Sequence, residues 1–88
     1  MLTVIKFGAS WCGPCKGYTP IFEKVVKEFE DNIISKEIDI EENVDMAEKY
    51  HIMQVPCTII LDEGGVVLKK ESGSLTAQNL KSIIIQCI

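Results

Sequence analysis

The 88-residue sequence lacks the features of membrane, exported and nucleic-acid-binding proteins. No apolar run approaches the roughly 18 residues of a membrane span. Residues Met1 to Lys6 have neither the basic head nor the length of a signal peptide. The 9 basic residues are outnumbered by 13 acidic ones and form no basic cluster. We therefore expect a cytoplasmic protein that binds neither membranes nor nucleic acid.

The sequence also lacks internal repeats, linkers and low-complexity stretches. Its content of 47% hydrophobic and 25% charged residues is that of an ordinary globular protein. A chain this short is long enough to form only one compact core. We expect a single domain over residues 1–88.

Hydrophobic patterning predicts an α/β chain with the order βαβ, a short helix, then ββα. The expected strands lie at residues 2–7, 33–40, 57–61 and 66–71. The expected helices lie at residues 14–30, 43–51 and after the capping residue Thr76. Pro20 lies inside the first helix, where it should produce a kink.

Alternating polarity predicts which side chains the second strand and the short helix bury. In the strand, the inward positions are Ile34, Ile38 and Ile40. In the short helix, they are Val44, Ala47 and Tyr50.

The strongest chemical signal is the segment Trp11-Cys12-Gly13-Pro14-Cys15-Lys16, at the junction of a buried strand and a helix. Two intervening residues let the sulfurs close a small ring, and unpaired N–H groups at a helix N-terminus favour a thiolate. We expect Cys12 to be the nucleophile. Cys15, one turn further in and more buried, should attack the mixed disulfide, release the substrate and leave a Cys12–Cys15 disulfide.

The same cysteine pair could instead form half of a zinc site. Tetrahedral zinc needs two more ligands, and the sequence offers only His51, Cys57 and Cys87, without a second CxxC. This shortage favours redox chemistry without a metal. His51, at the end of a short helix, is expected to lie in solvent or to satisfy a carbonyl group.

From residue 2 almost to its end, the chain resembles the thioredoxin family. The matching positions are the active-site segment 7–16, the helix-kinking Pro20, the cis-proline pair Val55-Pro56 and the groove glycine Gly73. The resemblance implies a thioredoxin fold with a minimal four-stranded mixed sheet and three helices, lacking the family's N-terminal strand and helix.

The resemblance also implies a protein-disulfide reductase that works by dithiol–disulfide exchange in electron transport and cell redox homeostasis. Its substrates would be disulfide-containing proteins, its electron donor a thioredoxin reductase, and its only redox group the Cys12–Cys15 disulfide, with no cofactor. The dipeptide Gly13-Pro14 resembles that of the reducing members. The alternatives are a glutaredoxin-like, glutathione-linked oxidoreductase and a thioredoxin-fold binding subunit without redox turnover.

By the same resemblance, four residues hold the target beside the thiols: Trp11, Val55, Pro56 and Gly73. Trp11 would pack beside Cys12. Three of these residues could instead have a purely structural role. Trp11 could belong to the core, Pro56 to an edge strand and Gly73 to a turn.

The chain departs from the family at two charged positions. The family's buried aspartate, which helps to deprotonate the second cysteine, aligns with Lys6, and its nearby lysine aligns with Glu37. We expect these residues to support the active site as neighbours on adjacent strands beneath Cys15. The alternative is that both are exposed.

Cys57 follows the cis-proline, where the family usually has threonine. We expect its side chain within several ångströms of Cys12, either as inert packing, which is favoured, or as a regulatory thiol. Without the family's first strand, residues 33–39 form a sheet edge, and the charges of Lys36, Glu37 and Asp39 should discourage pairing between chains. We expect a monomer.

Overall fold

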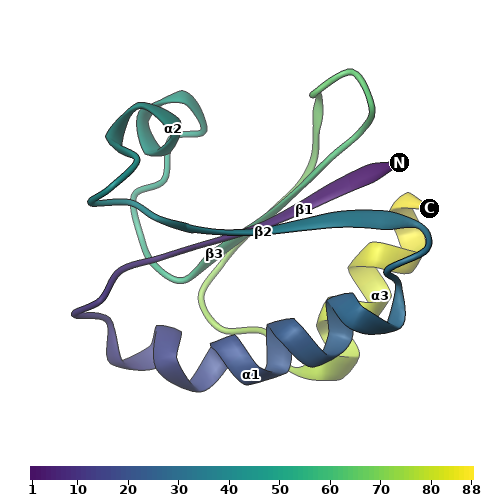
Figure 1. Ribbon diagram of the computed structural model, residues 1–88, viewed down its shortest axis with the longest axis horizontal. Helices are drawn as coiled ribbons and strands as arrows, with labels where there is room; N and C mark the ends of the chain where they lie inside the picture. Colours follow the sequence, from purple (N-terminus) through teal and green to yellow (C-terminus); the bar gives the residue numbers. More distant parts are fainter.

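The computed structural model describes residues 1–88 and contains the four strands and three helices that the sequence predicts, in the predicted order (Figure 1). The strands are β1 (Leu2–Gly8), β2 (Ile33–Asp39), β3 (Cys57–Leu61) and β4 (Val67–Ser72). The helices are α1 (Gly13–Glu28), α2 (Val44–Lys49) and α3 (Ala77–Cys87). Each boundary lies within about two residues of its expected position, as is usual for frayed ends.

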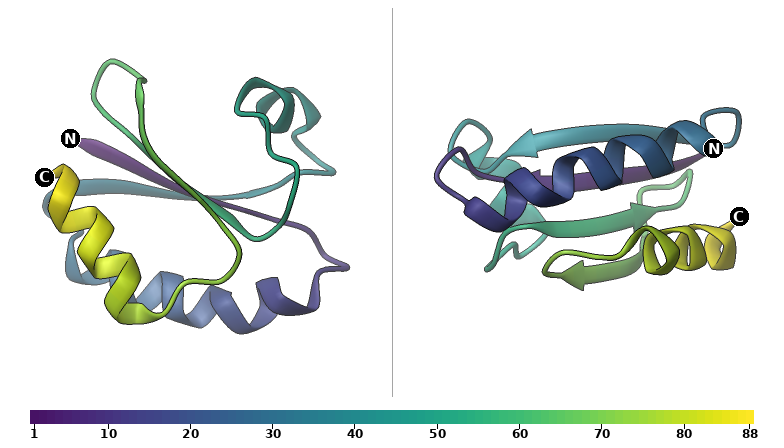
Figure 2. Two further views of the ribbon diagram at one scale, coloured as in Figure 1. Left: turned by 180° about the vertical axis from the view of Figure 1, so that it is seen from behind. Right: turned by 90° about the horizontal axis from the view of Figure 1, so that it is seen from below.

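The strands form one mixed sheet in the order β2-β1-β3-β4. β1 pairs in parallel with β2 and antiparallel with β3, and β3 and β4 form an antiparallel hairpin. A parallel pair needs a crossover connection, which α1 provides. α1 and α3 lie side by side on one face of the sheet, and α2 lies on the other (Figures 1 and 2).

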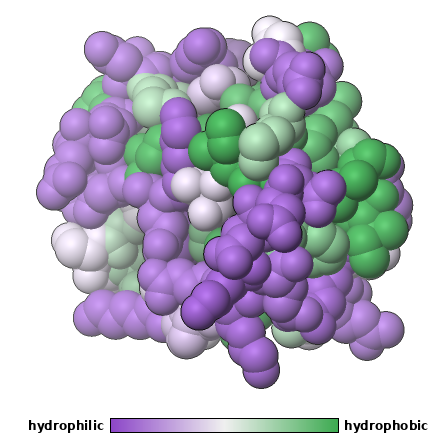
Figure 3. All heavy atoms as spheres, turned by 45° about the vertical axis from the view of Figure 1, so that its right-hand side comes forward, coloured by the Kyte–Doolittle hydropathy of each residue, from purple (hydrophilic) through white to green (hydrophobic).

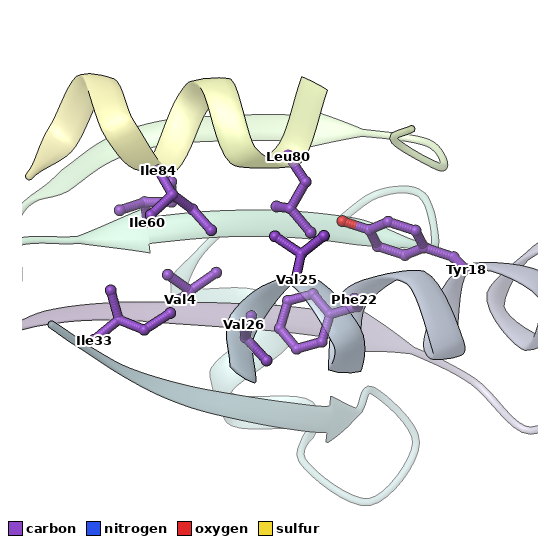
Figure 4. Close-up of a cluster of buried hydrophobic side chains, with 9 residues drawn as sticks. All are labelled: Val4, Tyr18, Phe22, Val25, Val26, Ile33, Ile60, Leu80 and Ile84. Atoms are coloured by element: carbon purple, nitrogen blue, oxygen red, sulfur yellow. The ribbon is translucent and has the colours of Figure 1, made fainter. Parts of the chain in front are cut away.

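The larger core lies between the sheet and the α1/α3 layer. Its buried members are Val4, Tyr18, Phe22, Val25, Val26, Ile33, Ile60, Leu80 and Ile84 (Figure 4). On the α2 face, a smaller cluster contains Ile5, Phe7, Cys57, Ile59 and Leu61. Because strand side chains alternate between faces, Val4 and Lys6 face α1, whereas Ile5 and Phe7 face α2.

Two of the expected inward positions are wrong. Ile34 is 48% exposed and Val44 is 53% exposed. β2 lies at the edge of the sheet, and α2 has only six residues, so α2 covers only part of that face. Ile38 and Ile40 do pack there, together with Met46 from α2.

The ends of the helices follow the local chemistry of the sequence. Thr76 caps α3 by accepting a hydrogen bond from the N–H of Asn79 at 3.1 Å. Pro20 lies inside α1. None of the helices has both the length and the apolar character that crossing a membrane requires. The surface seen in Figure 3 is largely hydrophilic, with separate apolar patches between the charged side chains.

Candidate active site

The two cysteines of the CxxC segment lie at the junction of β1 and α1, as predicted. Cys12 is the N-cap of α1, and Cys15 lies in the first turn, with 5.3 Å between the two Cα atoms of their disulfide. The N–H of Cys15 donates to Cys12 Sγ at 3.2 Å. An N–H left unpaired by the helix thus points at this sulfur, where it would stabilise a thiolate after reduction.

Gly13 and Pro14 form the start of α1 between the two cysteines. Proline suits this position because the first helical N–H groups have no partner within the helix and proline brings none. The dipeptide therefore lets the helix begin directly after Cys12.

The expectation that Cys15 is more buried than Cys12 is wrong for the disulfide form, because both residues are 4% exposed. Ala9, Ile40 and Val55 pack around the pair. In addition, Cys12 Sγ lies 3.7 Å from the carbonyl oxygen of Val55. The backbone of the loop before β3 therefore covers the sulfur of Cys12.

That loop contains the expected cis peptide bond between Val55 and Pro56. The carbonyl oxygen of Pro56 accepts a hydrogen bond from the N–H of Gly73 at 2.8 Å. Gly73 has φ +94°, which favours glycine. Trp11, next to Cys12, is 66% exposed and is therefore not part of the core.

Lys6 and Glu37 are partners in the parallel pairing of β1 and β2, which confirms that they are neighbours. Lys6 is 6% exposed, and its Nζ lies 3.4 Å from Glu37 Oε1. The Glu37 side chain is 40% exposed, so the pair is buried on the lysine side only. The alternative that both residues lie in solvent is wrong for Lys6.

Thr19 joins this pair to the disulfide and was missed in the sequence. Lys6 Nζ donates to Thr19 Oγ1 at 2.9 Å, and Thr19 Oγ1 donates to the carbonyl oxygen of Cys15 at 2.9 Å. A threonine four residues after a helical residue often makes this backbone contact, which is the signal that could have identified it.

A cavity of about 290 Å³ lies beside Cys15. The polar residues that line it include Lys6, Lys16, Thr19, Glu37 and Asp39. Since one water molecule takes about 30 Å³ in the liquid, this polar space has room for several.

Glu23, on α1, is a further carboxyl group near this cluster that sequence reasoning missed. A hydrogen bond with the Glu37 carboxyl group and the negative charge of Glu37 raise the pKa of Glu23 above its usual 4.5. Glu23 therefore keeps its proton to a higher pH than an isolated glutamate would.

The structure places Cys57 in a different buried cluster from Cys12, and their expected proximity stays a prediction. Cys57 is 1% exposed and packs with Phe7 and Ile59, whereas Cys12 belongs to a separate cluster. Burial raises the pKa of the Cys57 thiol above its usual 9.0, although Ser72 and Lys70 act in the opposite direction. This setting supports the packing role of Cys57.

The other residues considered for zinc lie apart from the disulfide. His51 is exposed at the end of α2 with φ +53°, and its carbonyl oxygen accepts from Lys70 Nζ at 2.7 Å. Cys87 is half-buried at the end of α3. The structure contains no group of three histidine, cysteine, aspartate or glutamate side chains that could hold a metal ion.

Comparisons with known proteins agree on one family. The thioredoxin family model matches residues 1–86. Thioredoxin of Bacillus subtilis is 41% identical over 61 residues, which are 69% of this chain and 59% of that protein. Thioredoxin of Staphylococcus aureus is 32% identical over 81 residues, which are 92% of this chain and 77% of that protein.

A solved structure gives the same result for the fold. The germline-specific thioredoxin Deadhead of Drosophila melanogaster superposes with a TM-score of 0.91 at 22% identity. The superposition covers 99% of this chain and 81% of that one. At this level of identity, the similarity concerns the fold alone.

Proposed function

Because the chain belongs to the thioredoxin family, we propose that its Cys12–Cys15 pair works mainly as a dithiol reductant of disulfides in other proteins. Members of this family are protein-disulfide oxidoreductases that need no cofactor beyond the redox disulfide. With its Cys12–Cys15 disulfide at the N-terminus of α1, the chain is a dithiol–disulfide oxidoreductase. The observation that carries the proposal is the Cys15 N–H that points at Cys12 Sγ.

The reaction begins with the reduced pair. The Cys12 thiolate attacks one sulfur of the substrate disulfide, a mixed disulfide forms, and the other substrate sulfur leaves and takes up a proton. The Cys15 thiolate then attacks Cys12 Sγ, and the second substrate sulfur leaves. Two electrons pass from the cysteine pair to the substrate, which becomes two thiols.

Four residues around Cys12 would hold the substrate. Trp11 offers an exposed aromatic surface, and the Val55 carbonyl lies 3.7 Å from Cys12 Sγ. An extended stretch of the target could hydrogen-bond to the backbone of Val55 and lie over Pro56 and Gly73, which are joined by a hydrogen bond. This arrangement would bring the target disulfide to Cys12.

The proposal includes the biological setting of the protein. A cytoplasmic monomer that takes electrons from a thioredoxin reductase would contribute to electron transport and cell redox homeostasis. The net charge of -4 at pH 7 and the charged residues along β2, at the sheet edge, support a monomer.

Reduction of insulin disulfides with two electron donors tests this function. One arm contains NADPH and thioredoxin reductase, and the other contains glutathione, glutathione reductase and NADPH. Activity in the first arm alone supports the proposal. Activity with glutathione alone would instead identify a glutaredoxin-like enzyme.

Cys12→Ser is the control in both arms, because serine cannot form the mixed disulfide. Insulin reduction that survives this substitution would contradict the proposed role of Cys12. A target protein that binds equally well to Cys12→Ser, with no insulin reduction by the parent in either arm, would indicate a binding subunit without redox turnover.

A further inference from the structure

Lys6 is the one charged residue in the buried part of this chain, and it lies near the second cysteine of the active site. It projects from β1 toward α1, two residues before Gly8. Lysine is almost never buried without a partner, because burial removes the water that stabilises the ammonium group. The burial of this ammonium group therefore depends on the residues around it.

The partners of Lys6 hold its ammonium group in place but neutralise it only in part. Thr19 Oγ1 accepts one hydrogen bond at 2.9 Å, and the same hydroxyl is anchored to the carbonyl oxygen of Cys15. Glu37 Oε1 lies 3.4 Å from Lys6 Nζ, and the Glu37 side chain is 40% exposed. Solvent screens the charge of a half-exposed carboxylate more strongly than that of a buried ammonium.

Lys6 Nζ and Cys15 Sγ border the same small space above Gly8. A methyl group added to Gly8 would lie 3.5 Å from Cys15 Sγ and 3.8 Å from Lys6 Nζ. Both residues also line the polar cavity of about 290 Å³. No other side chain combines burial, a positive charge and this proximity to Cys15.

The other charged groups around this cavity are Lys16, Glu37 and Asp39. Lys16 is exposed, and Asp39 Oδ1 already accepts the N–H of Glu41 at 2.8 Å. Glu23 is exposed and close enough to Glu37 and Lys6 to interact with both, but it does not line the cavity beside Cys15. We therefore assign the dominant effect on a charge at Cys15 to Lys6.

Resting on the proposed function, we propose that Lys6 is a positioning residue for the second step of the reaction, in which its buried ammonium stabilises the thiolate that Cys15 must form. Cys15 loses its proton to water through the polar cavity. Its thiolate attacks Cys12 Sγ of the mixed disulfide, the Cys12–Cys15 bond forms, and the bond from Cys12 to the substrate sulfur breaks. The substrate leaves as a thiolate and takes up a proton from water.

The test measures the Cys15 thiol directly in a Cys12→Ser background, without any substrate. The rate at which iodoacetamide modifies Cys15 is followed against pH, and mass spectrometry of the peptide separates Cys15 from Cys57 and Cys87. The pH at which this rate reaches half its maximum is the Cys15 midpoint. We expect Lys6→Met to raise the Cys15 midpoint by about one pH unit, which is the size typical of losing a nearby opposite charge. Lys24→Met, an exposed lysine of α1, is the matched control and should leave the midpoint unchanged.

Glu37→Gln should shift the Cys15 midpoint in the opposite direction. Removing the carboxylate leaves the positive charge of Lys6 less neutralised, so the Cys15 midpoint should fall. Lys6→Arg should retain the parent midpoint, because it keeps the charge. Glu37→Gln tests the effect of the carboxylate on the cavity, whereas the comparison of Lys6→Met with Lys6→Arg separates the charge of Lys6 from its packing.

Three results would overturn the proposal: an unchanged midpoint in folded Lys6→Met, a raised midpoint in Glu37→Gln, or a midpoint in Lys6→Arg as high as in Lys6→Met. If Lys6→Met does not fold, Lys6→Gln, a neutral side chain that can still hydrogen-bond to Thr19, is measured in its place. The measurement needs no electron donor or target protein. Its outcome is therefore independent of the insulin assay, which tests the proposed function.

Discussion

Cys15 and Cys57 are buried to nearly the same degree but in opposite surroundings. Cys15 is 4% exposed and borders a polar cavity with a lysine and a threonine, whereas Cys57 is 1% exposed among Phe7, Ile59 and other apolar side chains. Burial is the largest cause that raises the pKa of the Cys57 thiol. The comparison shows that the reactivity of a buried cysteine depends on the charges and dipoles around it more than on its exposed area.

The two surroundings are separated by the alternation of the strands. In the pairing of β1 with β3, Lys6 lies opposite Thr58 and Phe7 lies opposite Cys57. Thr58 turns toward α1, where its Oγ1 lies 2.7 Å from the hydroxyl of Tyr18. One step along the strand therefore separates polar neighbours from the apolar cluster around Cys57.

The sharpest test of the comparison exchanges one cysteine at a time. Cys12→Ser should reduce insulin reduction to the uncatalysed background, because the nucleophile is lost. Cys57→Thr should keep most of the activity, because Cys57 lies in a separate cluster. A Cys57→Thr protein that folds normally but is as inactive as Cys12→Ser would show that Cys57 takes part in the exchange.

A second test introduces polarity into the apolar cluster. Cys57→Asp should lower the free energy of unfolding by about 3 kcal/mol or more, because burial among Phe7 and Ile59 removes the water that stabilises a carboxylate. Cys57→Val, which keeps the site apolar and of similar size, should change it by less than about 1.5 kcal/mol. Urea denaturation measures both. Equal urea midpoints for Cys57→Asp and Cys57→Val would contradict the apolar character of this cluster.

A third test removes a charge at the polar site. Glu37→Ala should lower the free energy of unfolding by about 1 kcal/mol, because Lys6 loses its ion-pair partner but keeps Thr19. The matched control is Glu28→Ala, which breaks an exposed pair with Lys81 at 3.3 Å. The control should cost only a few tenths of a kcal/mol. If Glu28→Ala lowers the free energy of unfolding more than Glu37→Ala does, then the burial of Lys6 does not strengthen its ion pair with Glu37.

The smallest effect concerns Glu23 and depends on pH. Because Glu37 raises the pKa of Glu23 in the folded protein, deprotonation of Glu23 costs stability above that raised pKa, and the cost vanishes below its usual 4.5. Glu23→Gln should therefore shift the urea midpoint upward at pH 7 but not at pH 4. Glu28→Gln, which loses the contact with Lys81, should shift it downward at pH 7. A Glu23→Gln gain that persists at pH 4 would contradict the coupling.

The order of the elements and the position of the redox pair could be predicted from the sequence because they depend on local rules. Helical periodicity and a cap at Thr76 act over a few residues. The same holds for Cys12 at the start of α1, since a helix N-terminus presents its unpaired N–H groups to the residue that precedes it. The cis-proline and the neighbouring Lys6 and Glu37 followed from the family resemblance, and the structure agrees with both.

What only the tertiary structure decided is which neighbours each side chain meets. The alternation of side chains along β2 predicts which residues face α2. Ile34 faces it but is exposed, because the six residues of α2 are too few to cover the whole strand. The strand register places Cys57 opposite Phe7, and the position of α1 brings Thr19 between Lys6 and Cys15. The contacts of Cys57 with Phe7 and of Lys6 with Thr19 join residues far apart in the chain, so no local pattern contains them. They place one buried cysteine among apolar side chains and the other beside a buried charge.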